Sequence, residues 1–291
     1  MRDRNRGCRS QATGLMFCWV LLGGIFFALP LSSQDGPLSS QDGPLSSQDG
    51  PLSSQDGTRA DGTGIAQESV KPGINESFLD PNLNVDEFVA RFEVESREIF
   101  SSRESILRLL DLKVGDRIAD VGTGTGLFVE PFSERVGGEG WVFALDIAGP
   151  FVQRVGRLAE LRSLANVTPV LCGEDDVRLP PASIDVGFLC DVYHHFEFPR
   201  QSLRSLHRAL RPGGTLVVID FERIPGVSRE WTINHVRAGK DVFRKEIEEV
   251  GFEFIEEVKV PGFAENYFLR FRRPQSLSEK GSDPLEASRF H

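Results

Sequence analysis

Short apolar runs alternate with amphipathic segments between about residue 75 and residue 273. Five of these runs have the length and composition of strands: 117–121 (RIADV), 141–147 (WVFALDI), 167–172 (VTPVLC), 184–190 (IDVGFLC) and 215–220 (TLVVID). Helices are predicted between them, around 127–136, 150–165 and 199–210. Strands that are apolar throughout and separated by helices indicate a parallel sheet covered on both faces.

The beginning of this region is predicted to be helical. Phe88, Phe92 and Ile99 are spaced as an apolar stripe along an opening helix. Ser101 and Glu104 have the spacing of a capping box, in which two side chains satisfy free backbone N–H groups at a helix start. A second helix is therefore predicted to begin at Ser101.

The end of the region has a different pattern. A last helix is predicted near 240–250, and two apolar runs follow it, FEFIEEVKV (252–260) and NYFLRFR (266–272), with Pro261–Gly262 at the break. Two such runs joined by a short turn-rich segment predict a hairpin within the same sheet. The predicted fold class is α/β, with a doubly wound, mostly parallel seven-stranded sheet that ends in an antiparallel hairpin.

The first 33 residues have the pattern of an export signal. Four arginines and one aspartate lie within residues 2–9, and residues 14–31 carry no charge. Eighteen apolar residues are also near the minimum for spanning a bilayer, so an uncleaved anchor is an alternative. We expect this segment to engage the membrane or the export machinery, which makes the protein exported or membrane-anchored. A mis-assigned start codon would make the protein cytoplasmic.

A perfect repeat follows the leader. The unit LSSQDG occurs at 31–36, 38–43, 45–50 and 52–57, with a proline between copies. One leucine, one proline and an Asp-Gly turn in each unit leave no apolar seam, so a coiled coil is excluded. Residues 34–74 are predicted to be a flexible linker, 75–273 one folded domain, and the polar segment 274–291 a flexible tail.

Composition narrows the classes of partner. The 291 residues are 40% hydrophobic and 26% charged, which is sufficient for a sizeable core, and the formal net charge is −10 at pH 7. An acidic chain argues against nucleic-acid binding, which depends on clustered Lys and Arg. The cysteines, Cys8, Cys18, Cys172 and Cys190, have no CxxC spacing, which excludes a zinc ribbon and a disulfide-dense scaffold.

The strongest chemical signal is the segment Asp120-Val-Gly122-Thr123-Gly124-Thr-Gly126, directly after the first predicted strand. Glycines at a strand-to-helix turn let a ligand approach the backbone closely. Leu127 occupies the position of the third glycine in a dinucleotide fingerprint, and no Lys-Ser/Thr pair forms a Walker loop. Asp120 would be unfavourable beside a pyrophosphate and suits a cationic ligand.

The segment ADVGTGTG (119–126) resembles motif I of the class I S-adenosylmethionine-dependent methyltransferases, and later segments follow the family's order. The match extends over about residues 85–272 and is closest to the small single-domain bacterial members. The resemblance implies that S-adenosylmethionine is the cofactor. It implies that the glycine loop (Asp120, Gly122, Thr123, Gly124, Gly126) binds the methionine moiety, that Asp146, followed by Ile147, binds the ribose, and that Glu174 or Asp175 binds the adenine.

The segment DVGFLCDVYHHF (185–196) resembles motif IV, whose end faces the transferable methyl group. Asp191 and Tyr193 are the residues expected to touch the acceptor, and His194, His195, His235 or Asp191 is expected to take its proton. No metal site is predicted, because consecutive residues such as His194 and His195 point in opposite directions at a strand end.

The family's usual strand order places Cys172 and Cys190 three strands apart. At about 4.8 Å per strand this separation is roughly 14 Å, beyond the limit of about 7 Å for a disulfide. Both are therefore predicted to be free thiols.

The function expected from these residues is methyl transfer to a small-molecule acceptor by in-line displacement at the sulfonium, driven by positioning and desolvation. A nicotinamide-dependent oxidoreductase is an alternative that the missing third glycine disfavours. A second alternative is a non-catalytic exported binding or scaffold protein that retains the fold. Export would separate the protein from S-adenosylmethionine, which is made in the cytoplasm, and this would explain a loss of catalysis.

Overall fold

The structure is a computed structural model that describes residues 67–95 and 97–275. The predicted leader, the repeats and the end of the C-terminal tail lie outside the described residues. Within the described ranges, no helix combines the length and the apolar composition that a membrane span requires.

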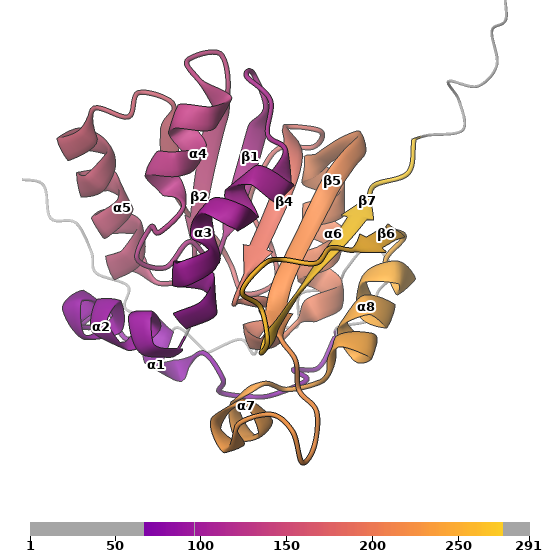
Figure 1. The fold of residues 1–291 in the computed structure, drawn as a ribbon. Helices are drawn as coiled ribbons and strands as arrows, with labels where there is room; N and C mark the ends of the chain where they lie inside the picture. The colour runs from indigo at the N-terminus through magenta and orange to yellow at the C-terminus, as the bar shows by residue number, and fades with distance from the viewer. Residues whose placement is uncertain (1–66, 96, 276–291) are drawn as a thin grey trace, which may run out of the picture. The chain divides into compact units, whose positions relative to one another are not determined.

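Seven strands form one sheet in the order β3-β2-β1-β4-β5-β7-β6 (Figure 1). The strands are β1 (Arg117–Val121), β2 (Trp141–Asp146), β3 (Val167–Leu171), β4 (Ile184–Cys190), β5 (Leu210–Phe221), β6 (Glu253–Glu257) and β7 (Asn266–Arg272). Strands β1 to β5 pair in parallel, whereas β7 is antiparallel to both β5 and β6. The predicted fold class and its closing antiparallel pair are confirmed.

The helices are α1 (Glu76–Leu79), α2 (Val85–Glu95), α3 (Arg97–Leu110), α4 (Val129–Val136), α5 (Gly149–Arg162), α6 (Pro199–Ala209), α7 (Glu230–His235) and α8 (Lys240–Glu249), with a 3-10 turn, η1 (Tyr193–His195). One core lies between the sheet and α3 and α4, and another lies between the opposite face and α6 and α8. Helices α1, α2 and α7 lie at the carboxyl ends of the parallel strands (Figure 1), where ligands bind in open α/β sheets.

Helix α3 begins at Arg97, so the predicted helix start at Ser101 is wrong. Ile99 is buried against the sheet, and this contact extends the apolar face one turn earlier than the capping pattern suggests. The Ser101 hydroxyl donates to the Glu98 carbonyl inside the helix, so Ser101 does not cap a helix start.

The folded domain also reaches further toward the N-terminus than residue 75. The Val70 N–H donates to the Glu197 carbonyl at 2.9 Å, and Lys71 Nζ donates to the His235 carbonyl at 2.7 Å. Residues 67–74, which the composition assigns to the linker, therefore lie against the domain and contact the loops at its ligand-binding end.

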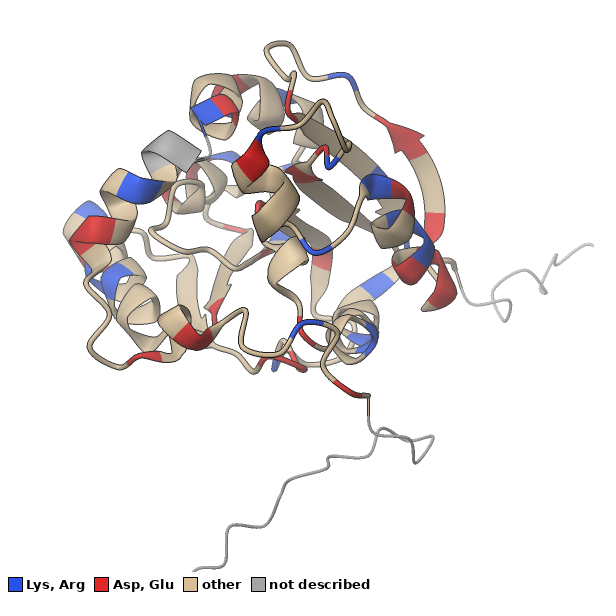
Figure 2. Ribbon diagram, turned by 90° about the horizontal axis from the view of Figure 1, so that it is seen from below, with Lys and Arg blue, Asp and Glu red and all other residues tan. Residues whose placement is uncertain are grey.

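Charged residues are distributed over the helices and loops that surround the sheet. Figure 2 shows Lys and Arg interspersed with Asp and Glu along these elements. Several cations lie between acids. Lys240 Nζ, for example, contacts Glu222 at 2.6 Å and Glu257 at 2.9 Å, which connects α8 to the residue after β5 and to the end of β6.

Candidate cofactor and acceptor site

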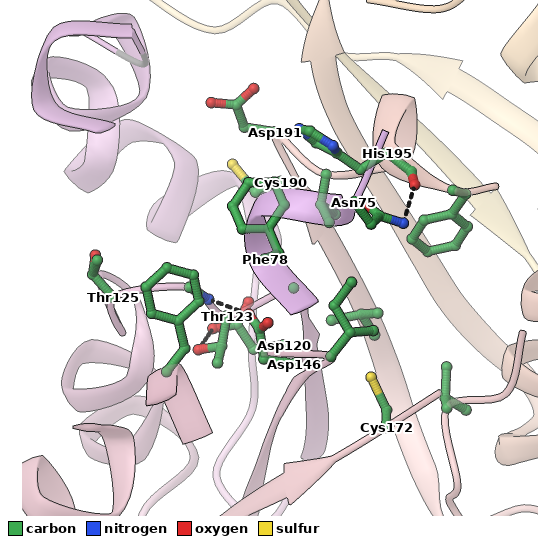
Figure 3. Close-up of a pocket in the computed structure, with 18 of the residues that line it drawn as sticks. Asn75, Phe78, Asp120, Thr123, Thr125, Asp146, Cys172, Cys190, Asp191 and His195 are labelled. Atoms are coloured by element: carbon green, nitrogen blue, oxygen red, sulfur yellow. Dashed lines mark hydrogen bonds between the residues drawn. The ribbon is translucent and has the colours of Figure 1, made fainter. Parts of the chain in front are cut away.

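A pocket opens at the carboxyl ends of β1, β2 and β4. The strand register explains its position: because Val121 pairs with Leu145, Gly122, the first residue after β1, lies beside Asp146, the last residue of β2. The lining residues are Asn75, Phe78, Phe92, Ile99, Phe100, Asp120–Thr125, Leu127, Phe128, Asp146, Ile147, Phe151, Cys172–Glu174, Asp176, Val177, Cys190–Val192, His195, Phe196 and Ser202. Figure 3 shows many of these side chains around the cavity.

The glycine loop forms one wall of the pocket. Gly122, Gly124 and Gly126 have φ angles of 72°, 52° and 88°, in the left-handed region that favours glycine. A Cβ on Gly122 would lie only 2.2 Å from Val192 Cγ2, so the loop packs directly against the segment after β4. The missing side chain at Gly122 is therefore needed for this close packing, and Gly122 and Gly124 line the pocket with their backbone.

Asp146 presents a carboxylate to the pocket at the end of β2. Its side chain is buried, and its two oxygens accept hydrogen bonds from the backbone N–H groups of Gly124 (2.8 Å) and Ala148 (2.9 Å). Burial raises the pKa of Asp146 to about 6 despite these bonds. Each carboxylate oxygen has a further lone pair, so two ligand hydroxyls can still donate to it.

Asp120 lies deeper in the same wall. Thr123 Oγ1 donates to Asp120 Oδ2 at 2.8 Å, which holds the carboxyl group beneath the loop (Figure 3). Burial, with a smaller contribution from the Asp146 charge, raises the pKa of Asp120 to about 7. A cationic ligand would favour the ionised form of this pair of acids.

The loop after β3 contributes carboxylates on another side. Glu174 lines the pocket, and its Oε1 accepts from Asn75 Nδ2 at 3.1 Å. Asp175, the alternative predicted adenine contact, is not among the lining residues, whereas its neighbour Asp176 is. The geometry therefore favours Glu174 of the two predicted candidates.

An N-terminal cover that the sequence did not assign to the site lies over the pocket. Asn75 Nδ2 donates to Glu174 Oε1 and to the His195 carbonyl, both at 3.1 Å, and joins two loops. Phe78, Phe88 and Phe92 pack on Phe151 of α5, with ring centroids between 5.4 and 6.4 Å apart. The spacing of Phe88 and Phe92 indicated a buried helix face, but nothing local indicated that it covers a ligand site.

The segment after β4 forms the end of the pocket away from Asp146. Asp191 and His195 both line it, as Figure 3 shows, next to Phe78 and Cys190. Tyr193 is not there: it is fully buried, and its hydroxyl donates to Glu246 at 2.8 Å beneath the Arg237 guanidinium. The structure thus corrects the expectation that Tyr193 touches the acceptor.

The three histidines predicted as candidate bases lie together. The His194 and His195 ring centroids are 4.3 Å apart, and His235 of α7 lies 5.1 and 5.0 Å from them. The prediction that His194 and His195 point in opposite directions is wrong, because they lie in the η1 turn and not in an extended strand. Burial lowers the pKa of His194 to about 3 and that of His195 well below its usual value.

Cys172 and Cys190 are free thiols, as predicted. Both line the pocket, and burial raises the pKa of Cys172 to about 12 and that of Cys190 well above its usual value. Neither is activated as a thiolate nucleophile, so they contribute apolar surface to the wall.

A doubly wound sheet with a glycine-rich first turn, a carboxylate at the end of the second strand and an adjoining apolar pocket defines a Rossmann-like domain that binds a nucleoside-type cofactor. Residues 119–218 match the family model for a methyltransferase domain. This match agrees with the class I S-adenosylmethionine-dependent methyltransferases that the motifs resemble, a class whose cofactor is S-adenosylmethionine.

Curated relatives agree with this class. The chain is 31% identical over 114 residues to the ubiquinone/menaquinone biosynthesis C-methyltransferase UbiE of Neisseria gonorrhoeae, a match that covers 39% of this chain and 46% of the relative. UbiE of Vibrio campbellii is 32% identical over 111 residues, which cover 38% of this chain and 42% of the relative. The matched segment spans less than half the length of these relatives.

Solved structures share the fold. An S-adenosylmethionine-dependent methyltransferase from Aquifex aeolicus superposes with a TM-score of 0.57 at 22% identity and covers 65% of this chain and 98% of its own. Phosphoethanolamine N-methyltransferase 2 from Haemonchus contortus, in complex with S-adenosylmethionine, has a TM-score of 0.51 at 18% identity and covers 60% of this chain and 52% of its own.

Proposed function

We propose that this domain transfers the methyl group of S-adenosylmethionine to a small-molecule acceptor by in-line displacement. The observation that carries the proposal is one pocket with two differently equipped ends. The glycine loop and Asp146 form the cofactor end, and Asp191 and His195 form the other. When bound, the cofactor supplies an electrophilic methyl group on a positively charged sulfur.

The residues of the cofactor end fit the parts of that molecule. Gly122 and Gly124 line the pocket and form the wall for the methionine portion, and the buried acids Asp120 and Asp146 favour its positive charge. Asp146 retains acceptor capacity for two ribose hydroxyls. Ile147, Val177 and the Glu174 segment supply an apolar and polar surface for a base.

At the acceptor end, the role of the protein is to position the acceptor and to exclude water from it. Asp191 and His195 are the polar side chains placed to contact the acceptor, and Phe78 covers them on one side. Orientation of the acceptor atom in line with the methyl group, with water excluded, is the main contribution expected of such a site. No strong protein nucleophile is required.

The relatives support an acceptor of low molecular mass, since those named above are C-methyltransferases of quinone biosynthesis. The pocket is lined largely by apolar residues and enclosed by α1 and α2, which favours a small molecule over a macromolecular surface. The non-catalytic alternative gains no support from these comparisons.

The experiment is a labelling assay. The full chain is incubated with methyl-labelled S-adenosylmethionine and a whole-cell extract, and the reaction is separated by mass, with Asp146→Ala as the control. Label that enters small molecules only with the unsubstituted chain supports the proposal. Label that enters protein or nucleic acid contradicts the small-molecule acceptor, and cofactor binding with no transfer favours the scaffold alternative.

We also propose that residues 1–33 direct the chain to the membrane or the export pathway. The support is the arginine-rich start followed by the uncharged segment 14–31. Fractionation of cells that express the full chain tests it. We expect the protein in the membrane fraction or the exported fraction. Recovery of the protein in the soluble cytoplasmic fraction would contradict this proposal.

A further inference from the structure

The three clustered histidines have a geometry that the methyltransferase assignment does not use. The Nε2 atoms of His195 and His235 lie 3.2 Å apart. Two nitrogens that each bind Zn²⁺ at about 2.0–2.1 Å with tetrahedral angles are about 3.3–3.4 Å apart. The observed separation is therefore close to the distance between two histidine nitrogens that bind the same Zn²⁺ ion.

His194 completes a set of three nitrogen donors. One ligand nitrogen from each of His194, His195 and His235 lies within 4.8 Å of the other two. His194 and His195 lie in η1, shortly after the end of β4, and His235 ends α7, which follows β5. Neighbouring parallel strands thus deliver the three donors to one point at their carboxyl ends.

Asp220 orients one of these donors. It is fully buried, and its Oδ1 lies 2.9 Å from His194 Nδ1. Its oxygens also accept hydrogen bonds from the backbone N–H groups of Phe221 (2.8 Å) and His194 (3.1 Å). These bonds fix the carboxylate in place beside the His194 ring. With Nδ1–H donated to Asp220, the lone pair of His194 lies on Nε2, an arrangement typical of histidines that bind metals.

The protein alone leaves this cluster incompletely satisfied. His195 Nδ1 is buried and has no hydrogen-bond partner among the described residues. If the contact with His235 is only an N–H···N hydrogen bond, it uses one ring nitrogen of His195 and leaves the other unpaired in either tautomer. Zn²⁺ bound to Nε2 of His195 and of His235 would replace that single bond with two coordinate bonds, and Nδ1 of His195 would still have no protein partner.

The surrounding charges are compatible with a cation. Arg237 lies nearby and is paired with the Glu246 carboxylate at 2.7 and 2.9 Å. Lys71 donates to the His235 carbonyl and keeps its positive charge, which opposes cation binding. Asp191 and Asp220 contribute negative charge within 4.8 Å of a His194 nitrogen.

We propose that His194, His195 and His235 form a site for a divalent transition-metal ion of the Zn²⁺ type, with Asp220 as the residue that positions His194. Three histidine donors leave a coordination position open. His195 lines the cofactor pocket beside Asp191, so the site adjoins the acceptor end, and an acceptor atom is the candidate for the open position. The inference that an oxygen, nitrogen or sulfur atom of the acceptor occupies it rests on the proposed function.

The test uses the full chain, freed of metal with a chelator and titrated with Co²⁺, followed by Zn²⁺ competition against a chromophoric indicator. One equivalent per chain with the visible absorption of four- or five-coordinate Co²⁺ is the expected result. His235→Ala should weaken Zn²⁺ binding by at least about 100-fold, and Asp220→Asn by about 10–100-fold, the range for residues that orient a ligand.

His207→Ala is the matched control. His207 packs on Phe252, with ring centroids 4.9 Å apart, and does not belong to the cluster. Zn²⁺ binding that is unchanged in His235→Ala, or absent from the unsubstituted chain, would overturn the proposal. Thermal unfolding shows whether each variant is folded.

Cofactor binding is measured on the same samples and separates the two hypotheses. Binding of S-adenosylmethionine without Zn²⁺ binding refutes only the metal site. Zn²⁺ binding without S-adenosylmethionine binding refutes only the proposed function.

Discussion

Asp146 Oδ2 accepts a hydrogen bond of 2.8 Å from the backbone N–H of Gly124. This bond joins the end of β2 to the turn after β1, and the bond from Ala148 to Oδ1 fixes the other carboxylate oxygen. The carboxylate is therefore positioned before any ligand arrives. A site that is organised in advance loses less conformational entropy on binding.

The first prediction concerns this carboxylate. Asp146→Ala should weaken S-adenosylmethionine binding by about 1–3 kcal/mol, because ribose hydroxyls would be buried without an acceptor. Calorimetric titration measures the change. Asp241→Ala, an exposed substitution at the start of α8, is the control and should leave affinity unchanged. Equal affinity in both variants would refute the ribose assignment.

The second prediction is a pH dependence of cofactor binding. Burial raises the pKa of Asp146 to about 6 and that of Asp120 to about 7. A carboxylate that accepts two hydroxyl protons, beside a cationic ligand, binds best when ionised, so affinity should rise with pH and level off above about 7. For Asp146 alone, the loss at pH 5 is about tenfold.

Calorimetry in two buffers with different ionisation enthalpies should also show proton release on binding near pH 6. Asp146→Asn should remove the part of the pH dependence centred near pH 6. An affinity that is constant between pH 5 and pH 8 would contradict the proposed role of these acids.

The third prediction tests the packing of the glycine loop. Gly122→Ala should lower the free energy of unfolding by about 1–3 kcal/mol or more. The backbone at this position is left-handed, and the added Cβ would lie 2.2 Å from Val192 Cγ2. Val192→Ala in the same chain should restore part of the loss. Gly138→Ala, where a Cβ meets nothing within 4 Å, should change stability by less than about 0.5 kcal/mol. Urea unfolding measures all three.

The fourth prediction concerns the cover. Asn75→Ala removes the bonds to Glu174 and to the His195 carbonyl, so the cofactor should dissociate about fivefold faster, equivalent to about 1 kcal/mol. Stopped-flow displacement measures the rate. Asn82→Ala, an exposed position between α1 and α2, serves as control, and an identical dissociation rate in both variants would show that the cover does not retain the ligand.

Local pattern was sufficient to predict the sheet. The runs 117–121 and 184–190 coincide with β1 and β4, because a strand buried on both faces is apolar throughout and bounded by polar residues. The glycines of the loop follow the end of β1, and Asp146 is the last residue of β2. Their proximity follows from parallel pairing, so the core of the cofactor end was also predictable.

The rest of the site depends on contacts between residues distant in the sequence. Asn75 joins residues that lie 99 and 120 positions away, which no local spacing reveals. After β4, Asp191 has a φ of 58° and the chain turns into η1, so strand alternation does not continue. This turn places Tyr193 in the core and brings the His194 and His195 rings together.

The most direct test of the account is calorimetric titration of the full chain with S-adenosylmethionine, S-adenosylhomocysteine and NADH. The account predicts micromolar binding of the first two, at one site per chain, and no binding of NADH. If neither sulfur compound binds, or if NADH binds in their place, the assignment of this pocket to S-adenosylmethionine is wrong.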